Sequence, residues 1–189
     1  MVVLRRWRRF SRQVWMRVLA IGLQLLALSG MAQEYGEYEV KAAYLYNFAR
    51  FAKWPTSVFA EDSSLLVLCI VGKNPFGDAL DALAGKAVDT HAIRIQHMTG
   101  LPGVAALRGC HLLFISRSEQ GRLPQLLATL EGLPVLSVSD IDSFAQVGGM
   151  IGLVERDRRI HFDINLAVVQ RSGIRLSSQL LKLARVFDE

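Results

Sequence analysis

Two cysteines, Cys69 and Cys110, are the residues of this 189-residue chain with the most chemical promise, and they are its only cysteines. Exported proteins commonly join such a pair in a disulfide, and the N-terminal segment described below predicts export. Closing a loop of roughly 40 residues would stabilise the fold by about 4 kcal/mol in the chain-entropy model. The sequence leaves three alternatives for this pair: a redox-responsive bond, an inert structural bond, or two free buried thiols.

The strand pattern bears on the geometry of this bond. Cys69 falls late in one expected strand and Cys110 at the start of another. In an in-register parallel pair, at about 3.3 Å per residue, they would be offset by roughly 10 Å. The sequence therefore predicts backbone adjustment or a strained bond, which would be more reducible.

Other reactive side chains form no recognisable site. The four histidines are His91, His97, His111 and His161. None lies three or four residues from another, and no acidic cluster accompanies them, so no metal site is expected. The chain has no Gly-x-Ser-x-Gly motif, and we expect neither an enzyme nor a cofactor.

Two polar segments have ordinary interpretations. The loop Gly72–Gly77 follows a strand where anions often bind, but it lacks the Walker and dinucleotide spacings and is best explained as a capped turn. A hairpin could bring Glu155, Asp157 and Asp163 together, but solvated charges on an exposed face are the favoured interpretation.

The elements that must position these residues alternate between strands and helices. Branched apolar runs predict buried strands at residues 65–71, 112–115 and 135–138, with another strand around Ile93 and Ile95. Helical spacing predicts helices at residues 37–53, 76–84 and 119–130, and one after Ser177 that includes Leu180, Leu181, Ala184, Val186 and Phe187. Residues 150–154 and 160–164 predict an antiparallel hairpin. The fold class is therefore α/β, with a mainly parallel sheet flanked by helices on both faces and a C-terminal antiparallel hairpin.

The first 32 residues have the pattern of a signal peptide. Six arginines and no acidic residue precede the apolar run Val18–Leu28, which is shorter than the roughly 20 residues of a membrane span. Small residues at Gly30 and Ala32 predict cleavage after Ala32, with an uncleaved anchor as the open alternative. The mature chain, residues 33–189, would be one domain.

Loss of this segment changes the charge of the protein. The whole chain carries 22 Lys and Arg against 17 Asp and Glu, a net charge of +5. Without the six arginines, 16 basic residues face 17 acidic ones. The mature chain shows no basic stripe, so binding to nucleic acid is not expected.

Three sequence blocks together resemble the YfiR family. They are residues 41–55 (KAAYLYNFARFAKWP), 148–152 (GGMIG), and 159–166 (RIHFDINL) continuing to 177–185 (SSQLLKLAR). The resemblance covers essentially all of the mature chain. It implies a periplasmic α/β protein, not an enzyme, that binds the periplasmic region of an inner-membrane diguanylate cyclase and represses cyclic di-GMP synthesis. It further implies sequestration by an outer-membrane OmpA-like lipoprotein, a homodimer, and a link between the cysteines and periplasmic redox conditions.

Site residues follow from the matched positions. Cys69 and Cys110 match the family's first cysteine pair, whereas a second pair near residues 145–152 is absent here. The further matched positions are Trp54-Pro55, Gly148-Gly149, Asn165, Ser178 and Arg185. Trp54 and Arg185 are the expected partner contacts, because tryptophan and arginine are enriched among interface anchors. The alternative function is a periplasmic small-molecule binding protein that uses the crevice at the carboxyl ends of the strands.

Overall fold

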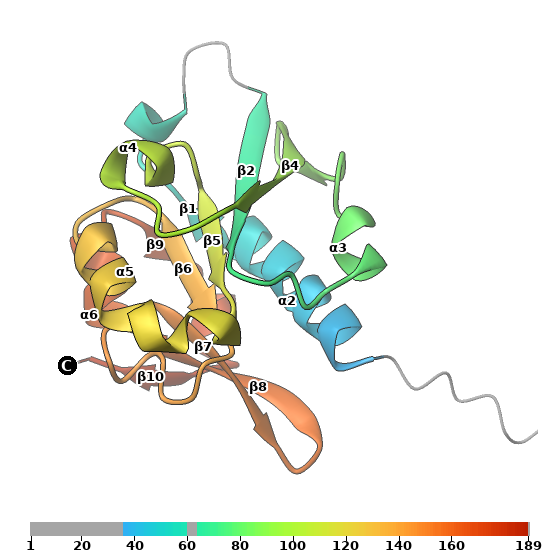
Figure 1. The fold of residues 1–189 in the computed structure, drawn as a ribbon, viewed down its shortest axis with the longest axis vertical. Helices are drawn as coiled ribbons and strands as arrows, with labels where there is room; N and C mark the ends of the chain where they lie inside the picture. Colours follow the sequence, from blue (N-terminus) through green and yellow to red (C-terminus); the bar gives the residue numbers. More distant parts are fainter. Residues whose placement is uncertain (1–35, 60–63, 189) are drawn as a thin grey trace, which may run out of the picture. The chain divides into compact units, whose positions relative to one another are not determined.

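The computed structural model describes residues 36–59 and 64–188 (Figure 1). The predicted signal peptide, residues 1–32, lies outside this range. The main sheet of the described part has eight strands in the order β10-β8-β7-β6-β5-β2-β4-β3. They are Leu65–Val71 (β2), Ala87–Val88 (β3), His91–Met98 (β4), Leu112–Ile115 (β5), Leu136–Ser139 (β6), Ile151–Arg156 (β7), Arg159–Asn165 (β8) and Arg185–Phe187 (β10).

Short helices connect these strands. The helices are Glu37–Phe51 (α2), Asp78–Asp81 (α3), Val104–Leu107 (α4), Leu123–Leu130 (α5), Leu166–Arg171 (α6) and Ser178–Leu181 (α7), with 3-10 turns at Thr56–Val58 and Arg117–Arg122. A small second ribbon pairs Ala52–Lys53 (β1) with Arg175–Leu176 (β9) in antiparallel fashion.

The α/β class and the mainly parallel sheet are confirmed. Strand β2 pairs in parallel with both β4 and β5, β5 with β6, β6 with β7, and β8 with β10. In the described part of this main sheet only β7–β8 and β3–β4 are antiparallel, and β7–β8 is the predicted hairpin. Its two-residue turn has positive φ at both Asp157 and Arg158, the conformation that suits the twist of a tight hairpin.

The central strands are apolar on both faces because both faces are buried. Successive side chains of a strand point to opposite sides, and the residues of β2 divide accordingly between two buried clusters. Leu66, Leu68 and Ile70 pack in one cluster with residues of α2 and α3. Cys69 and Val71 pack in the other with residues of α4 and α5. Cys69 therefore points into the second cluster.

Helix α2 begins where its sequence predicts but ends two residues earlier, because Ala52 and Lys53 pair with Arg175–Leu176 as strand β1. The Gly36 N–H donates to Glu39 Oε2 at 3.1 Å, and Glu37 and Glu39 place negative charge in the first turn. The helix ends at Phe51, before Trp54-Pro55, since proline disfavours helical geometry in the residue before it. Its buried face includes Leu45 and Phe48 and, unexpectedly, Lys41.

The helix predicted for residues 76–84 is wrong in its extent. Asn74 Oδ1 accepts a hydrogen bond from the Phe76 N–H at 2.9 Å, which is a local turn and not a helix cap. Gly77 then has a φ of 52°, and the helix that follows spans only Asp78–Asp81. The left-handed residue interrupts the helix that the apolar spacing suggested.

The end of the chain also differs from the prediction. Ser177 does cap a helix, since its side chain accepts from the Leu180 N–H at 3.2 Å. However, this helix ends at Leu181, and Arg185–Phe187 form strand β10, in parallel register with Asp163–Asn165 of β8. Pairing with a strand that would otherwise be a sheet edge overrides a weak local helical pattern.

Candidate functional site

Cys69 and Cys110 form a disulfide with Cα atoms 5.8 Å apart. The strand offset of about 10 Å that the sequence suggested is not found. Cys69 is paired with Leu113, but Cys110 lies before β5, where the chain is still turning out of α4 and the Cys110 N–H donates to the Leu107 oxygen at 2.9 Å. This turn places the cysteines within the ordinary Cα range of a disulfide.

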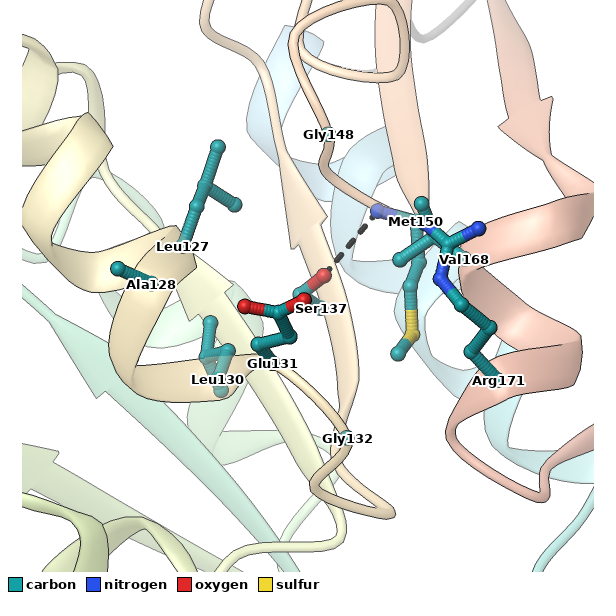
Figure 2. A pocket seen from close by; sticks show the side chains of 10 residues that line it. All are labelled: Leu127, Ala128, Leu130, Glu131, Gly132, Ser137, Gly148, Met150, Val168 and Arg171. Carbon is teal, nitrogen blue, oxygen red and sulfur yellow. Dashed lines mark hydrogen bonds between the residues drawn. The ribbon is translucent and has the colours of Figure 1, made fainter. Parts of the chain in front are cut away.

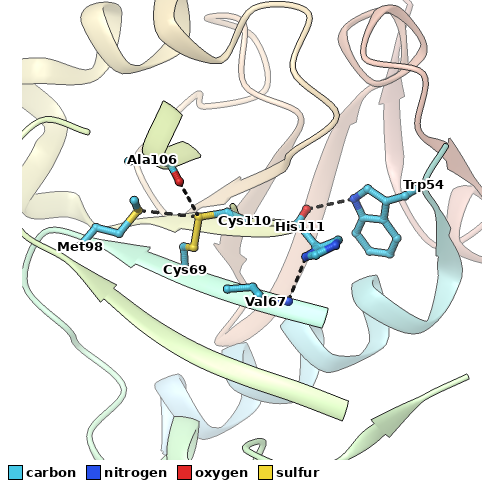
Figure 3. The surroundings of a disulfide bond; sticks show 7 residues. All are labelled: Trp54, Val67, Cys69, Met98, Ala106, Cys110 and His111. Carbon is cyan, nitrogen blue, oxygen red and sulfur yellow. Dashed lines mark hydrogen bonds between the residues drawn. A yellow bond between two sulfur atoms is a disulfide. The ribbon is translucent and has the colours of Figure 1, made fainter. Parts of the chain in front are cut away.

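The bond is enclosed by apolar side chains. Both cysteines are fully buried, and Met98 Sδ at the end of β4 lies 3.8 Å from Cys110 Sγ (Figure 3). The Ala106 carbonyl oxygen lies 3.9 Å from the same sulfur. Attack by a thiolate therefore requires an opening of this cluster.

Trp54 lies beside the residue that follows the disulfide. Its indole Nε1 donates to the His111 carbonyl oxygen at 3.0 Å, and its ring lies edge-on to the His111 imidazole (Figure 3). Phe59 stacks on that imidazole at a centroid distance of 4.6 Å and on His91 at 4.1 Å. Trp54, half-buried in this stack, has a clear internal role, and its predicted partner contact stays a prediction.

His111 is held in its neutral form. Its Nδ1 accepts the Val67 N–H at 3.0 Å, so Nδ1 carries no proton, and the buried Nε2 has no hydrogen-bond partner in the described part of the chain. Burial, with a smaller contribution from His91, lowers the pKa of His111 to about 4. The imidazole is thus neutral at neutral pH.

A buried ionic cluster that the sequence analysis did not identify joins α2 to the carboxyl end of β6. Lys41 and Asp140 are 2% and 1% exposed, and Lys41 Nζ lies 2.6 Å from Asp140 Oδ2. Glu37 also contacts the Lys41 ammonium. The Tyr38 hydroxyl donates to Asp140 Oδ2 at 2.9 Å, and the Arg117 Nε donates to the Asp140 carbonyl oxygen. The sequence did carry one signal that Lys41 is buried. Its helical spacing from Leu45 and Phe48 places all three residues on the same, apolar face of α2.

The charges of this cluster stabilise one another. Burial by itself lowers the pKa of Lys41, but the hydrogen bonds from Lys41 to Asp140 and Glu37 outweigh it, and the net shift is upward. Burial, followed by the hydrogen bond to Asp140, raises the pKa of Tyr38. Lys41 is therefore a fixed positive charge, and the cluster locks α2 onto the sheet.

Asp163 is not the solvated charge that the sequence suggested. It is buried on β8, its carboxylate accepts hydrogen bonds from Arg156 Nη2 at 3.0 and 3.1 Å, and Gln146 Nε2 lies 3.4 Å away. The neighbouring Asn165 is also buried and caps α6 through its Oδ1, while its Nδ2 donates to the Ala145 oxygen. The pairing of β8 with both β7 and β10 encloses these polar residues.

The crevice at the carboxyl ends of β2 and β5 is filled by protein. A Cβ on Gly72 would lie 2.4 Å from Ser118 Oγ and 2.8 Å from Glu119 Cγ, and the Lys73 N–H donates to the Ser118 hydroxyl. Chain order reverses at this point of the sheet, where α/β proteins commonly bind ligands. Here the protein's own side chains occupy that position.

A cavity of about 240 Å³ lies elsewhere, between α5 and α6 (Figure 2). Glu131 and Arg171 line it together with apolar residues such as Leu127 and Met150. It lies where β6 and β7 diverge, since only two residue pairs join these strands. Its volume is below the roughly 300 Å³ at which ligand pockets usually begin.

Arg185, the second predicted partner contact, is exposed on the edge strand β10, where its guanidinium lies 4.8 Å from the Phe187 ring centroid. The neighbouring Leu183 and Val186 are 73% and 37% exposed. Within the described residues no hydrogen bond or ring contact joins Arg185 to Trp54, and the two positions belong to different elements. An exposed arginine with exposed apolar residues close to it in the sequence has the composition of an interface anchor.

Metal binding and membrane crossing were the two remaining possibilities for the described residues. Within residues 36–59 and 64–188, no three His, Cys, Asp or Glu side chains are grouped so that they could hold a metal ion. None of the helices in the same range combines the length and apolar character needed to cross a bilayer.

The matched sequence blocks have structural counterparts. Gly149 packs against Phe144 with no room for a Cβ, Asn165 and Ser177 cap helices, and Trp54 holds the chain beside the disulfide. The model of one protein family matches residues 38–185, which are nearly all of the described residues. The chain therefore belongs to the YfiR/HmsC-like family.

Proposed function

We propose that this protein is a periplasmic negative regulator that binds the periplasmic region of an inner-membrane diguanylate cyclase and represses cyclic di-GMP synthesis. Membership of the YfiR/HmsC-like family over residues 38–185 is the observation that carries this proposal. A fully buried disulfide is consistent with it, because such bonds persist in oxidising compartments.

Repression in this proposal is a population shift. The cyclase exchanges between an active and an inactive state, and the regulator must bind the inactive state more tightly. To move that equilibrium from 1:99 to 99:1, the two affinities must differ by about 10⁴-fold. An OmpA-like lipoprotein of the outer membrane would relieve repression by competing for the regulator.

The surface around β10 is the contact we favour. Arg185 offers a charged anchor, and Leu183 and Val186 offer exposed apolar area before and within β10. Trp54 is the second proposed contact. Its indole N–H is already bonded internally, so only its exposed ring area is free for a partner.

The first experiment measures intracellular cyclic di-GMP after deletion of the gene, with complementation by the wild type. The expected result is a rise that the wild type reverses. An unchanged level, with the cyclase shown to be expressed, would refute the regulator. Complementation by Cys69→Ser with Cys110→Ser then tests the bond: a folded, exported double variant that fails to repress indicates that repression requires the disulfide.

The contact surface is tested by charge reversal. Arg185→Glu should weaken repression while leaving thermal stability within about 0.5 kcal/mol of wild type, since Arg185 is exposed. Arg108→Glu, an exposed arginine between α4 and β5, is the matched control and should repress normally. Equal repression by both variants would remove β10 from the interface.

A small-molecule binding function is the second candidate, and the cavity in Figure 2 supports it. Glu131 and Arg171 on its rim would suit a small ligand that carries both charges. A thermal shift with candidate metabolites, abolished by Ala128→Trp at the exposed mouth of the cavity, would favour this function.

A further inference from the structure

Met98 lies at the surface of the apolar cluster that encloses the disulfide. The chain has five methionines, and residues 33–189 contain two of them, Met98 and Met150. Met150 is only 3% exposed. Met98, the last residue of β4, is partly exposed and packs against the cluster that contains both cysteines. Of these two thioethers, Met98 is therefore the one that a dissolved oxidant can reach.

The Met98 side chain contacts the disulfide directly. Its Sδ lies 3.8 Å from Cys110 Sγ, and Figure 3 shows the side chain reaching from the end of β4 towards that sulfur. The parallel pairing of β4 with β2 ends here, with Met98 opposite Val71. The next three residues, 99–101, are exposed, and Gly100 has a φ of 72°. The side chain can thus turn outward without breaking a hydrogen bond of the sheet.

We propose that Met98 is an oxidation site, at which a peroxide converts the thioether to a sulfoxide and thereby uncovers the disulfide. A lone pair of the sulfur attacks one peroxide oxygen, and the O–O bond breaks. The transferred oxygen stays on the sulfur, and the departing hydroxide takes the proton of that oxygen and leaves as water. Methionine loses two electrons and the peroxide gains them, while the disulfide keeps its oxidation state.

The surroundings of Met98 suit a thioether better than a sulfoxide. A sulfoxide oxygen accepts hydrogen bonds and donates none, and the cluster around the cysteines consists of apolar side chains. The Ala106 carbonyl oxygen, 3.9 Å from Cys110 Sγ, is itself an acceptor. Because a buried acceptor without a donor costs free energy, the oxidised side chain turns towards solvent. A thiolate can then approach Cys110 without a prior opening of the cluster.

This site is separate from the proposed cyclase contact, and its test involves no cyclase. The protein expressed from the full-length chain is treated with hydrogen peroxide, and its tryptic peptides are followed by mass spectrometry. The peptide with Met98 should gain one oxygen atom at least about tenfold faster than the peptide with Met150, because Met150 reacts only after local opening. Equal rates for the two methionines, or no oxygen gained at Met98, would overturn the proposal.

The rate at which dithiothreitol reduces the disulfide tests the consequence of oxidation. Once catalase has removed the peroxide, the treated wild type should be reduced at least about tenfold faster than the untreated protein. Met98→Leu keeps an apolar side chain of similar volume that peroxide cannot oxidise, so its reduction rate should not respond to peroxide. Met150→Leu is the matched control and should respond as the wild type does. An oxidised wild type reduced at the original rate, or a Met98→Leu protein that peroxide accelerates equally, would overturn the proposal.

Discussion

Acidification should destabilise this fold through His111. The folded-state pKa of about 4 lies below the unfolded value of 6.5, so the unfolded chain binds a proton more readily. The contribution of the neutral imidazole is fully present above about pH 7 and is lost as pH falls from 6.5 towards 4. At about pH 5 the linkage relation gives a loss of roughly 2 kcal/mol, and below pH 4 about 3 kcal/mol.

The side chain is only 6% exposed, so solvent screens this effect little. The assay is urea denaturation followed by circular dichroism at several pH values between about 7.5 and 5. His111→Asn is the matched variant, because its amide oxygen can accept the Val67 N–H in place of Nδ1 but does not titrate.

We expect His111→Asn to be less stable than wild type at pH 7.5, because it loses the stacking on Phe59, and to have a flatter pH dependence. The measured quantity is the difference in slope between the two proteins. If both lose the same stability between pH 7.5 and 5, another group titrates and the assignment to His111 is refuted.

Three further predictions concern stability. Reduction of the disulfide in denaturant should lower the free energy of unfolding by about 4 kcal/mol, measured by urea titration with and without dithiothreitol; no change would argue against a stabilising bond. Lys41→Met should cost about 3 kcal/mol because it removes the nearest cation from the buried Asp140 carboxylate and leaves it with the more exposed Arg117, whose Nε lies 3.6 Å away; adding Asp140→Asn should recover part of the loss, and strictly additive losses would contradict this coupling. Gly149→Ala should cost about 1 to 3 kcal/mol or more, because its Cβ would lie 2.2 Å from the Phe144 ring, whereas Gly121→Ala, with no atom within 4 Å, should be nearly neutral in the same thermal melts.

Much of the fold follows from local sequence. Strands β2 and β5 have the bounds that their apolar runs predict, because a strand buried on both faces needs an uninterrupted branched sequence. The β7–β8 hairpin and the start of α2 are likewise encoded by alternation and by the acidic first turn of the helix, whereas the last two residues predicted for α2 form strand β1. The three family blocks were visible in the sequence, and the family model that matches residues 38–185 agrees with them.

Other features depend on contacts between distant residues. The Lys41–Asp140 pair joins residues 99 positions apart, and the buried Asp163 is contacted by Gln146 and Arg156 from elsewhere in the chain. Residues 185–187 contain helix-compatible residues and become a strand because β8 offers an unpaired edge.

The two cysteines show the same division. The sequence predicted that an exported chain would join them, but strand spacing alone placed them about 10 Å out of register. The turn from α4 into β5 brings their Cα atoms to 5.8 Å. Periodicity thus determined most of the strands and helices, and only tertiary structure decided strand β10, the ion pairs and the disulfide geometry, since these depend on three-dimensional packing that no local pattern records.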